Sequence, residues 1–208
     1  ETMYKTLSLA STHGVEIGAH PAYPDLVGFG RRSMKCTDNE LKALIWYQIG
    51  ALAGVARPLN LSVSYVKPHG ALYNDMMRSQ HLLSLVMTAV KEYDAGLKVM
   101  IPVTLDHQAH AKLAATIGIE VVLEAFADRA YDDTGRLVPR DTLGAVHHDP
   151  YKIVEQARSF ATLGGLHSVS GRWLDLPAQS LCVHGDNAES VQAVASIRAA
   201  LQAAEDAQ

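Results

Sequence analysis

Residues 97–123, LKVMIPVTLDHQAHAKLAATIGIEVVL, contain two short apolar runs separated by a stretch with helical character. The first run, 97–101, stops at Pro102, a helix is expected over 106–117, and 119–123 form the second run. Two buried strands joined by a helix are typical of a βαβ crossover, which pairs its strands in parallel. The segment therefore predicts a parallel α/β fold.

The same alternation continues on both sides of this segment. We expect further strands at 15–20, 63–69 and 181–184, an extended piece at 166–170, and helices at 2–13, 40–57, 71–93, 151–163 and 187–204. Five or six such units suit an open doubly wound sheet or a closed (β/α) barrel. The chain has neither GxGxxG nor GxxxxGK[ST], which weakens the nucleotide-binding versions of the open sheet.

Length and composition indicate one ordinary globular domain over residues 1–208. Hydrophobic residues make up 48% and charged residues 19%, and the net charge is −4. Because no basic run occurs, neither nucleic acid nor an anionic membrane is an expected partner. Two isolated cysteines, Cys36 and Cys182, argue against a disulfide framework, and no signal peptide or spanning segment is recognisable, so we expect a cytoplasmic protein. A homo-oligomer stays open.

The chain starts directly in a predicted helix, with Met3, Leu7 and Ala10 on one face. A domain rarely begins in the middle of its architecture. We therefore expect the barrel to be incomplete at its N-terminal end.

Polar residues gather where the predicted strands end. They are His20, Lys67, His69, Glu124, His184 and Asp186. In parallel α/β folds the carboxyl ends of the strands meet at one edge, where active sites form. Each of the three histidines is followed by Pro or Gly, and we expect at least two of them to line a site.

The loop after the first predicted strand, HPAYPDLVGFGRR at 20–32, is stiffened by two prolines and two glycines. It carries the carboxylate of Asp25 and the guanidinium groups of Arg31 and Arg32. Arg presents a fork that matches planar oxyanions, so the loop suits carboxylate recognition. An ordinary surface loop with both arginines in solvent is an equally acceptable interpretation.

Lys67 and His69 occupy alternate positions, so they could share one face of a strand. A lysine at an apolar strand end is costly unless it is paired or used. We expect Lys67 to polarise a carbonyl or phosphoryl oxygen and His69 to move protons.

Glu124 follows four apolar strand residues and is a candidate catalytic residue, whereas Asp128, Arg129 and Arg140 could equally form a salt-bridged hairpin. His184 and Asp186 precede the last helix, where Asp186 could bind substrate or simply cap the helix.

Two further histidine groups have structural interpretations. His147, His148 and Asp149 are adjacent on an extended chain and are expected to cap the next helix. His107 and His110 are expected on a solvated helix face.

Four segments carry a family resemblance: GVEIGAHPAYPDLVGFGRRSM (14–34), YVKPHGALYND (65–75), EAFADRAYDDTGRLVPR (124–140) and CVHGD (182–186). In order and spacing they resemble the LamB/YcsF family. The resemblance implies a TIM-like, seven-stranded (β/α) barrel similar to polysaccharide-deacetylase and glycoside-hydrolase barrels. The family's opening segments, which resemble NCDLGE and ANIACGFHAGD, do not occur here, so an Asp, a Glu and a His of the barrel mouth are missing from this sequence.

The family resemblance also implies a function, namely that of the A subunit of an ATP-dependent 5-oxoprolinase. With two partner subunits (B and C type), such an enzyme converts 5-oxo-L-proline, ATP and water into L-glutamate, ADP and phosphate. Because this chain has no ATP-binding motif of its own, ATP is expected to bind with the partners.

The expected site roles follow from this reaction. Arg31, Arg129 or Arg140 would anchor the substrate carboxylate, Lys67 would stabilise an oxyanion, and proton transfer would fall to His20, His69, Glu124 or His184. Two alternatives stay open. One is a stand-alone metal-dependent amide hydrolase or deacetylase, with His20 and His69 as candidate ligands; the other is a non-catalytic binding subunit.

Overall fold

The computed structural model describes residues 1–183 and 188–206. Its helices are α1 (Thr2–Thr12), α2 (Asp38–Ala56), α3 (Gly70–Met76), α4 (Gln80–Tyr93), α5 (His107–Ile117), α6 (Pro150–Leu163) and α7 (Ala188–Glu205), with a short 3-10 helix, η1 (Arg57–Leu59). Its strands are β1 (Ile17–Ala19), β2 (Val63–Val66), β3 (Lys98–Pro102), β4 (Glu120–Phe126), β5 (Gly165–His167), β6 (Trp173–Asp175) and β7 (Ser180–Cys182).

The main sheet confirms the predicted fold class. Among the described residues it has five strands in the order β1-β2-β3-β4-β7. The pairs β1–β2, β2–β3 and β4–β7 are parallel, with helices between successive strands. This is the arrangement of an incomplete (β/α) barrel.

The chain divides into two compact units. Unit 1 comprises Glu1–Ile101 and His110–Val121, and unit 2 comprises Pro102–Ala109 and Val122–Gln208. Each unit has buried hydrophobic residues of its own. That the chain folds as one domain stays a prediction.

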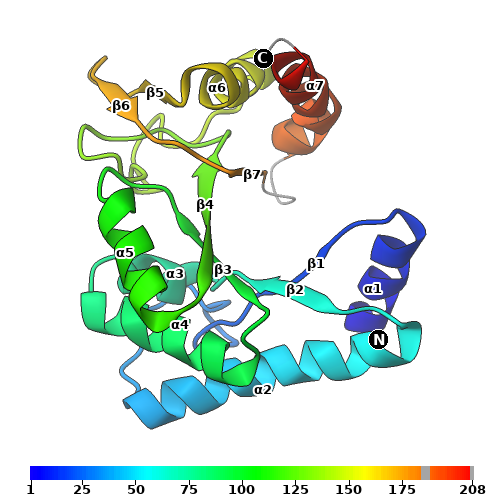
Figure 1. Ribbon diagram of the computed structural model, residues 1–208. Helices are drawn as coiled ribbons and strands as arrows, with labels where there is room; N and C mark the ends of the chain where they lie inside the picture. Colours follow the sequence, from blue (N-terminus) through cyan, green and yellow to red (C-terminus); the bar gives the residue numbers. More distant parts are fainter. Residues whose placement is uncertain (184–187, 207–208) are drawn as a thin grey trace. The chain divides into compact units, whose positions relative to one another are not determined.

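Helix α2 is the long helix of unit 1, and it packs on β1 and β2 (Figure 1). Its buried face carries Leu41, Ile45 and Ile49. The helix begins with a capping box. The Thr37 hydroxyl accepts from the Glu40 backbone N–H, and the Glu40 carboxylate accepts from the Thr37 backbone N–H. These two bonds satisfy amides that a helix start leaves unpaired.

The expected helix over 71–93 is two helices, α3 and α4. Ser79 lies between them in an extended conformation, and its side chain accepts from the Leu82 backbone N–H. Ser is a strong helix N-cap because its hydroxyl accepts an otherwise unpaired amide. A cap inside an apolar periodic stretch thus starts a second helix.

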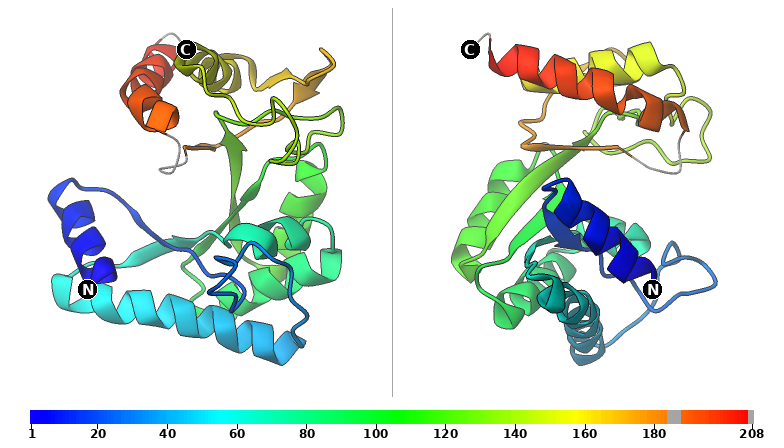
Figure 2. Two further views of the ribbon diagram at one scale, coloured as in Figure 1. Left: turned by 180° about the vertical axis from the view of Figure 1, so that it is seen from behind. Right: turned by 90° about the vertical axis from the view of Figure 1, so that its right-hand side faces the viewer.

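In unit 2, helices α6 and α7 lie side by side in all three views (Figures 1 and 2). Small and branched side chains of the two helices, together with Ala127 after β4, form one buried cluster: Ile153, Ala157, Ala193 and Ile197. Small side chains let the two helix axes approach closely, because little volume has to be accommodated between them.

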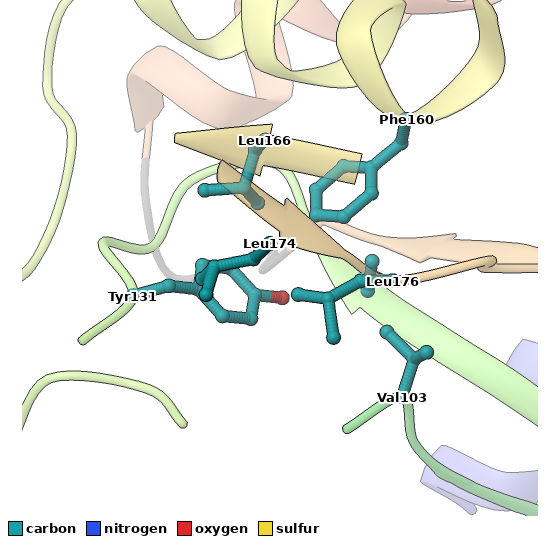
Figure 3. Packing of buried hydrophobic residues seen from close by; sticks show 7 residues of the cluster. Val103, Tyr131, Phe160, Leu166, Leu174 and Leu176 are labelled. Atoms are coloured by element: carbon teal, nitrogen blue, oxygen red, sulfur yellow. The ribbon is translucent and has the colours of Figure 1, made fainter. Parts of the chain in front are cut away.

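A second cluster in unit 2 surrounds the antiparallel pair of β5 and β6 (Figure 3). Phe160, Leu166, Leu174 and Leu176 pack there against Tyr131. The extended piece expected at 166–170 corresponds to β5, but its partner β6 was not expected. Strands of three residues are too short to show an alternating hydrophobic pattern.

None of the helices within residues 1–183 and 188–206 is both long enough and apolar enough to cross a membrane.

Candidate active site

The candidate site of unit 1 lies where β1 and β2 end. The parallel pairing continues beyond both strands, since the Lys67 N–H donates to the Ala19 carbonyl at 2.9 Å and the His69 N–H donates to the Pro21 carbonyl at 2.8 Å. This ladder places the segment after β1 beside the segment after β2. The strand itself stops at Val66, so Lys67 and His69 project from a loop instead of one strand face.

The side chains of His20 and His69 meet at this edge. Nδ1 of His69 lies 2.9 Å from Nε2 of His20, and the ring centroids are 4.7 Å apart at an interplanar angle of 70°. The ring of His20 is exposed and that of His69 is half-buried. The structure thus brings together two of the predicted catalytic residues.

Backbone carbonyls determine which nitrogens of the two rings carry protons. Nδ1 of His20 lies 2.5 Å from the Lys67 carbonyl oxygen, and Nε2 of His69 lies 2.8 Å from the Phe29 carbonyl oxygen. A carbonyl only accepts, so each of these nitrogens must be an N–H donor. In neutral rings the two facing nitrogens would then both be lone pairs. One proton between them turns the 2.9 Å contact into a hydrogen bond, which suits the pair for proton transfer.

Two glycines allow the loop after β1 to reach His69. Gly30 has φ +67 and Gly70 has φ +60, both in the left-handed region. The Gly30 carbonyl accepts from the Ala71 N–H at 2.9 Å. A Cβ on Gly70 would lie 2.4 Å from that carbonyl oxygen, so only glycine permits this approach.

Two cations of the same segments lie against aromatic rings. The Nζ atom of Lys67 lies 5.8 Å from the centroid of the Tyr73 ring, and Cζ of Arg31 lies 5.5 Å from the centroid of the Phe29 ring. Both distances are in the range of cation–π attraction, which limits where the charged groups can move. Arg31 is exposed, as a residue that receives a substrate carboxylate would need to be.

Asp25 and Arg32 form an ion pair inside the same loop. The Arg32 Nε lies 3.0 Å from Oδ2 of Asp25, the Arg32 Nη2 also donates to this carboxylate, and the Gly28 N–H donates to Oδ1 at 2.9 Å. Chiefly because of the hydrogen bonds from Arg32, the pKa of Asp25 is lowered to about 2. Asp25 therefore stays ionised at every ordinary working pH.

In unit 2, Glu124 lies within β4, which runs three residues further than expected. Its side chain is buried, and its backbone pairs with Ser180 of β7. Nearby, the Tyr131 hydroxyl oxygen accepts from the Phe126 N–H at 2.9 Å. Burial, chiefly, raises the pKa of Tyr131, so this phenol stays neutral.

Arg129 is buried and binds the loop that follows it. Its Nη2 donates to the Val138 carbonyl at 2.6 Å and its Nε donates to the Ala145 carbonyl at 3.2 Å. Burial and the nearby charge of Arg140 lower the pKa of Arg129, whereas Asp128 opposes that change. Arg140 itself is exposed. The guanidinium of Arg129 thus closes a long loop on itself.

A cavity of about 600 Å³ in unit 2 is lined by His147, His148, Asp149 and Gln156, among others. Nε2 of Gln156 donates to the Phe126 and Arg129 carbonyls, so its Oε1 is the acceptor for His147 Nε2 at 3.3 Å. Burial lowers the pKa of His147. Asp149 caps α6 by accepting from the Tyr151 N–H, which confirms its expected structural role.

The predicted residues therefore fall into three sets. His20, Asp25, Arg31, Lys67 and His69 belong to unit 1, where the side chains of His20 and His69 are in contact, while Glu124, Asp128, Arg129 and Arg140 belong to unit 2. His184 and Asp186 lie outside the described residues. His107, expected on a solvated helix face, is half-buried and contacts the Thr104 carbonyl through Nδ1 at 3.0 Å.

Sequence reasoning missed two groups of the unit 1 site. One is the Phe29 carbonyl and the other is the Tyr73 ring. A backbone acceptor leaves no mark in the residue types. Gly30 was a signal in the residue types, because glycine can mark a close approach of another backbone.

The described residues contain no group of three or more His, Cys, Asp or Glu side chains placed to hold a metal ion. The two facing nitrogens of His20 and His69 would provide two ligands. A protein site usually needs at least three.

Comparison with known proteins decides the family. A family model described as LamB/YcsF matches residues 1–207. The chain belongs to the LamB/YcsF family.

Relatives in this family carry consistent names. One of the 5-oxoprolinase A subunits of Pseudomonas putida is 53% identical over 203 residues, covering 98% of this chain and 79% of the relative. The 5-oxoprolinase A subunit of Pyrococcus horikoshii is 44% identical over 200 residues, covering 96% and 77%. Among solved structures, the lactam utilization protein from Thermus thermophilus superposes with a TM-score of 0.87 at 37% identity, covering 98% of this chain and 80% of that one.

Proposed function

We propose that this LamB/YcsF chain is a subunit of an ATP-dependent 5-oxoprolinase and takes part in opening the lactam of 5-oxo-L-proline to L-glutamate. The names of its relatives support the substrate class. One observation carries the chemistry: an imidazole pair with a 2.9 Å contact lies beside Lys67 at the carboxyl ends of two neighbouring parallel strands.

The reaction needs an activated amide, since a five-membered lactam is a poor electrophile. Transfer of the γ-phosphoryl group of ATP to the amide oxygen releases ADP and turns the ring carbon into a good electrophile. Water adds to that carbon, the C–N bond breaks and the nitrogen takes up a proton. A second water releases phosphate from the resulting acyl phosphate. The sum is 5-oxoproline, ATP and two waters to glutamate, ADP and phosphate.

The residues of the unit 1 site match these steps. His20 and His69 would take a proton from the attacking water and return one to the ring nitrogen. Lys67 would stabilise negative charge on the phosphorylated oxygen. Arg31 would bind the substrate carboxylate through its planar fork.

Several finer assignments belong to this proposal. ATP would bind together with partner subunits of the B and C type, and the complex would work in the cytoplasm. The roles expected for Glu124, Asp128, Arg129, Arg140, His184 and Asp186 stay predictions, as does any homo-oligomer.

The test is release of glutamate and phosphate from 5-oxoproline and ATP by the full-length protein, alone and with its candidate partner subunits. We expect activity only in the complete, ATP-containing mixture. Activity of the protein alone with a divalent metal and no ATP would contradict the proposal in favour of a lone amide hydrolase. Full activity of complexes carrying Lys67→Met or His69→Gln would instead indicate a non-catalytic binding subunit.

A further inference from the structure

The orientation of the His69 ring depends on an unusual turn in the loop after β1. The Phe29 carbonyl that accepts from His69 Nε2 belongs to a residue with φ +54, and the next residue, Gly30, has φ +67. Phe29 and Gly30 are the two central residues of a turn that the Arg31 N–H closes by donating to the Gly28 carbonyl at 3.0 Å. For phenylalanine this left-handed conformation is unfavourable. Such a turn persists only where neighbouring contacts hold it.

Asp25 and Arg32 supply those contacts from the two ends of the turn. Besides the ion pair between their side chains, the Asp25 carbonyl accepts from the Gly30 N–H at 2.8 Å. The Asp25 carboxylate also accepts from the Gly28 N–H. A Cβ on Gly28 would lie 2.0 Å from Oδ2 of Asp25, so the glycine leaves the space that the carboxylate occupies.

The Asp25 carboxylate is committed to this turn. Only 6% of the residue is exposed, and Oδ1 and Oδ2 both accept from Arg32. Arg32 approaches from the solvent side, where most of its side chain is exposed. The ion pair between Asp25 and Arg32, called the clasp below, therefore connects the two ends of the turn from its solvent side.

We infer that Asp25 and Arg32 are positioning residues, which act through the Phe29 carbonyl to hold His69 with its proton on Nε2 and its Nδ1 directed at His20. A carbonyl that accepts from one ring nitrogen of a histidine fixes the tautomer and so sets the role of the other nitrogen. Loss of the clasp would free the turn, and His69 would then exchange between its two tautomers. The activity part of this inference rests on the proposed function, whereas the tautomer part does not.

The experiment uses full-length protein with three variants. Asp25→Asn removes the negative charge and replaces one of the two carboxylate oxygens that accept hydrogen bonds. Arg32→Lys keeps the positive charge but loses the planar guanidinium. Lys35→Gln is the control. Lys35 is exposed and follows the same loop, and its substitution by glutamine also removes one charge. Two readouts are taken: the ¹⁵N spectrum of His69, assigned by its loss in His69→Gln, and kcat and KM for 5-oxoproline in the complete mixture.

We expect the wild type and Lys35→Gln to show His69 protonated on Nε2. Asp25→Asn should show mixed tautomers and a kcat about tenfold lower, with KM within twofold, because misplaced catalytic groups cost rate more than binding. Arg32→Lys should fall between these two. An unchanged His69 spectrum in Asp25→Asn overturns the inference, and a raised KM with unchanged kcat would make Asp25 a substrate contact.

Two controls keep the result interpretable. If Asp25→Asn fails to fold, Arg32→Lys alone decides, since it leaves the Asp25–Gly28 hydrogen bond in place. If no mixture shows activity, the proposed function has failed. The His69 spectrum then still supports the positioning role or overturns it.

Discussion

Nδ1 of His69 lies 2.9 Å from Nε2 of His20, although 49 positions separate the two residues in the sequence. Their other ring nitrogens face the carbonyls of Phe29 and Lys67. The backbone thus orients both rings so that their remaining nitrogens face each other across this contact.

Substitution of His20 tests proton transfer through this contact. His20→Gln can still donate a hydrogen bond to His69 Nδ1 from its amide, but an amide does not transfer protons at neutral pH. We expect kcat for ATP-dependent glutamate release to fall about 100-fold, the usual size of a general acid–base contribution. Activity within twofold of wild type would mean that the hydrogen bond, and not proton transfer, is what His20 provides.

Lys67 is expected to act through its charge. Lys67→Met keeps the length of the side chain and should lower kcat by about 100-fold or more, as loss of an oxyanion stabiliser does. Lys67→Arg keeps a cation near the Tyr73 ring and should retain several times the activity of Lys67→Met. Equal activities of the two variants, measured in the complete mixture, would show that the charge is not what matters.

Substitutions of Gly70 and of Gly14 can be compared to test the close approach of Gly70 to the Gly30 carbonyl. Both have positive φ, +60 and +61, but a Cβ on Gly14 meets nothing within 4 Å, whereas one on Gly70 meets the Gly30 carbonyl oxygen. Gly14→Ala should cost about 1 kcal/mol of unfolding free energy from backbone strain alone. Gly70→Ala should cost at least about 1 kcal/mol more in urea unfolding and should also lower activity. Equal costs would contradict the tight approach.

Arg129 is expected to stabilise unit 2 through its two carbonyl contacts. Arg129→Met leaves the Val138 and Ala145 carbonyls without this donor and should lower the unfolding free energy by about 2–4 kcal/mol. Arg140→Gln, at an exposed position, should change it by no more than about 0.5 kcal/mol. The unfolding free energies of both variants are measured in urea. A small loss of unfolding free energy in Arg129→Met, similar to that in Arg140→Gln, would contradict the loop closure by Arg129.

His147 gives unit 2 a dependence on pH. Because burial lowers its pKa below the ordinary value of about 6.5, folding favours the neutral ring. Its contribution to stability is therefore complete above about pH 6.5 and is lost as the pH falls through the lowered pKa. His147→Gln keeps a donor for Gln156 and should lose less stability between pH 8 and pH 5. An identical loss in the variant, by urea midpoint, would contradict this.

The sequence was sufficient to predict most elements and the set of strand-end residues. Apolar runs such as 97–101 and 119–123 mark buried strands directly, and parallel pairing then places His20 beside Lys67 and His69. What could not be predicted depends on tertiary geometry. The Ser79 cap, the β5–β6 pair and the Phe29 carbonyl leave little or no residue pattern.

Asp25 illustrates the same limit at a single residue. From the sequence, a carboxylate in a loop with two arginines suggests substrate binding. Which arginine it pairs with depends on the turn at Gly28 and Gly30, and the structure pairs it with Arg32 while Arg31 lies beside Phe29. Two adjacent arginines cannot be assigned different roles from the sequence unless the conformation of that turn is known.

The most direct test of the central claim is kcat for ATP-dependent glutamate release by a complex that contains His69→Gln, with assembly of the subunits verified. If the His20–His69 pair moves the protons of lactam opening, kcat falls at least about 100-fold while the complex stays intact. A kcat within twofold of wild type would contradict the account and place the chemistry outside the unit 1 site.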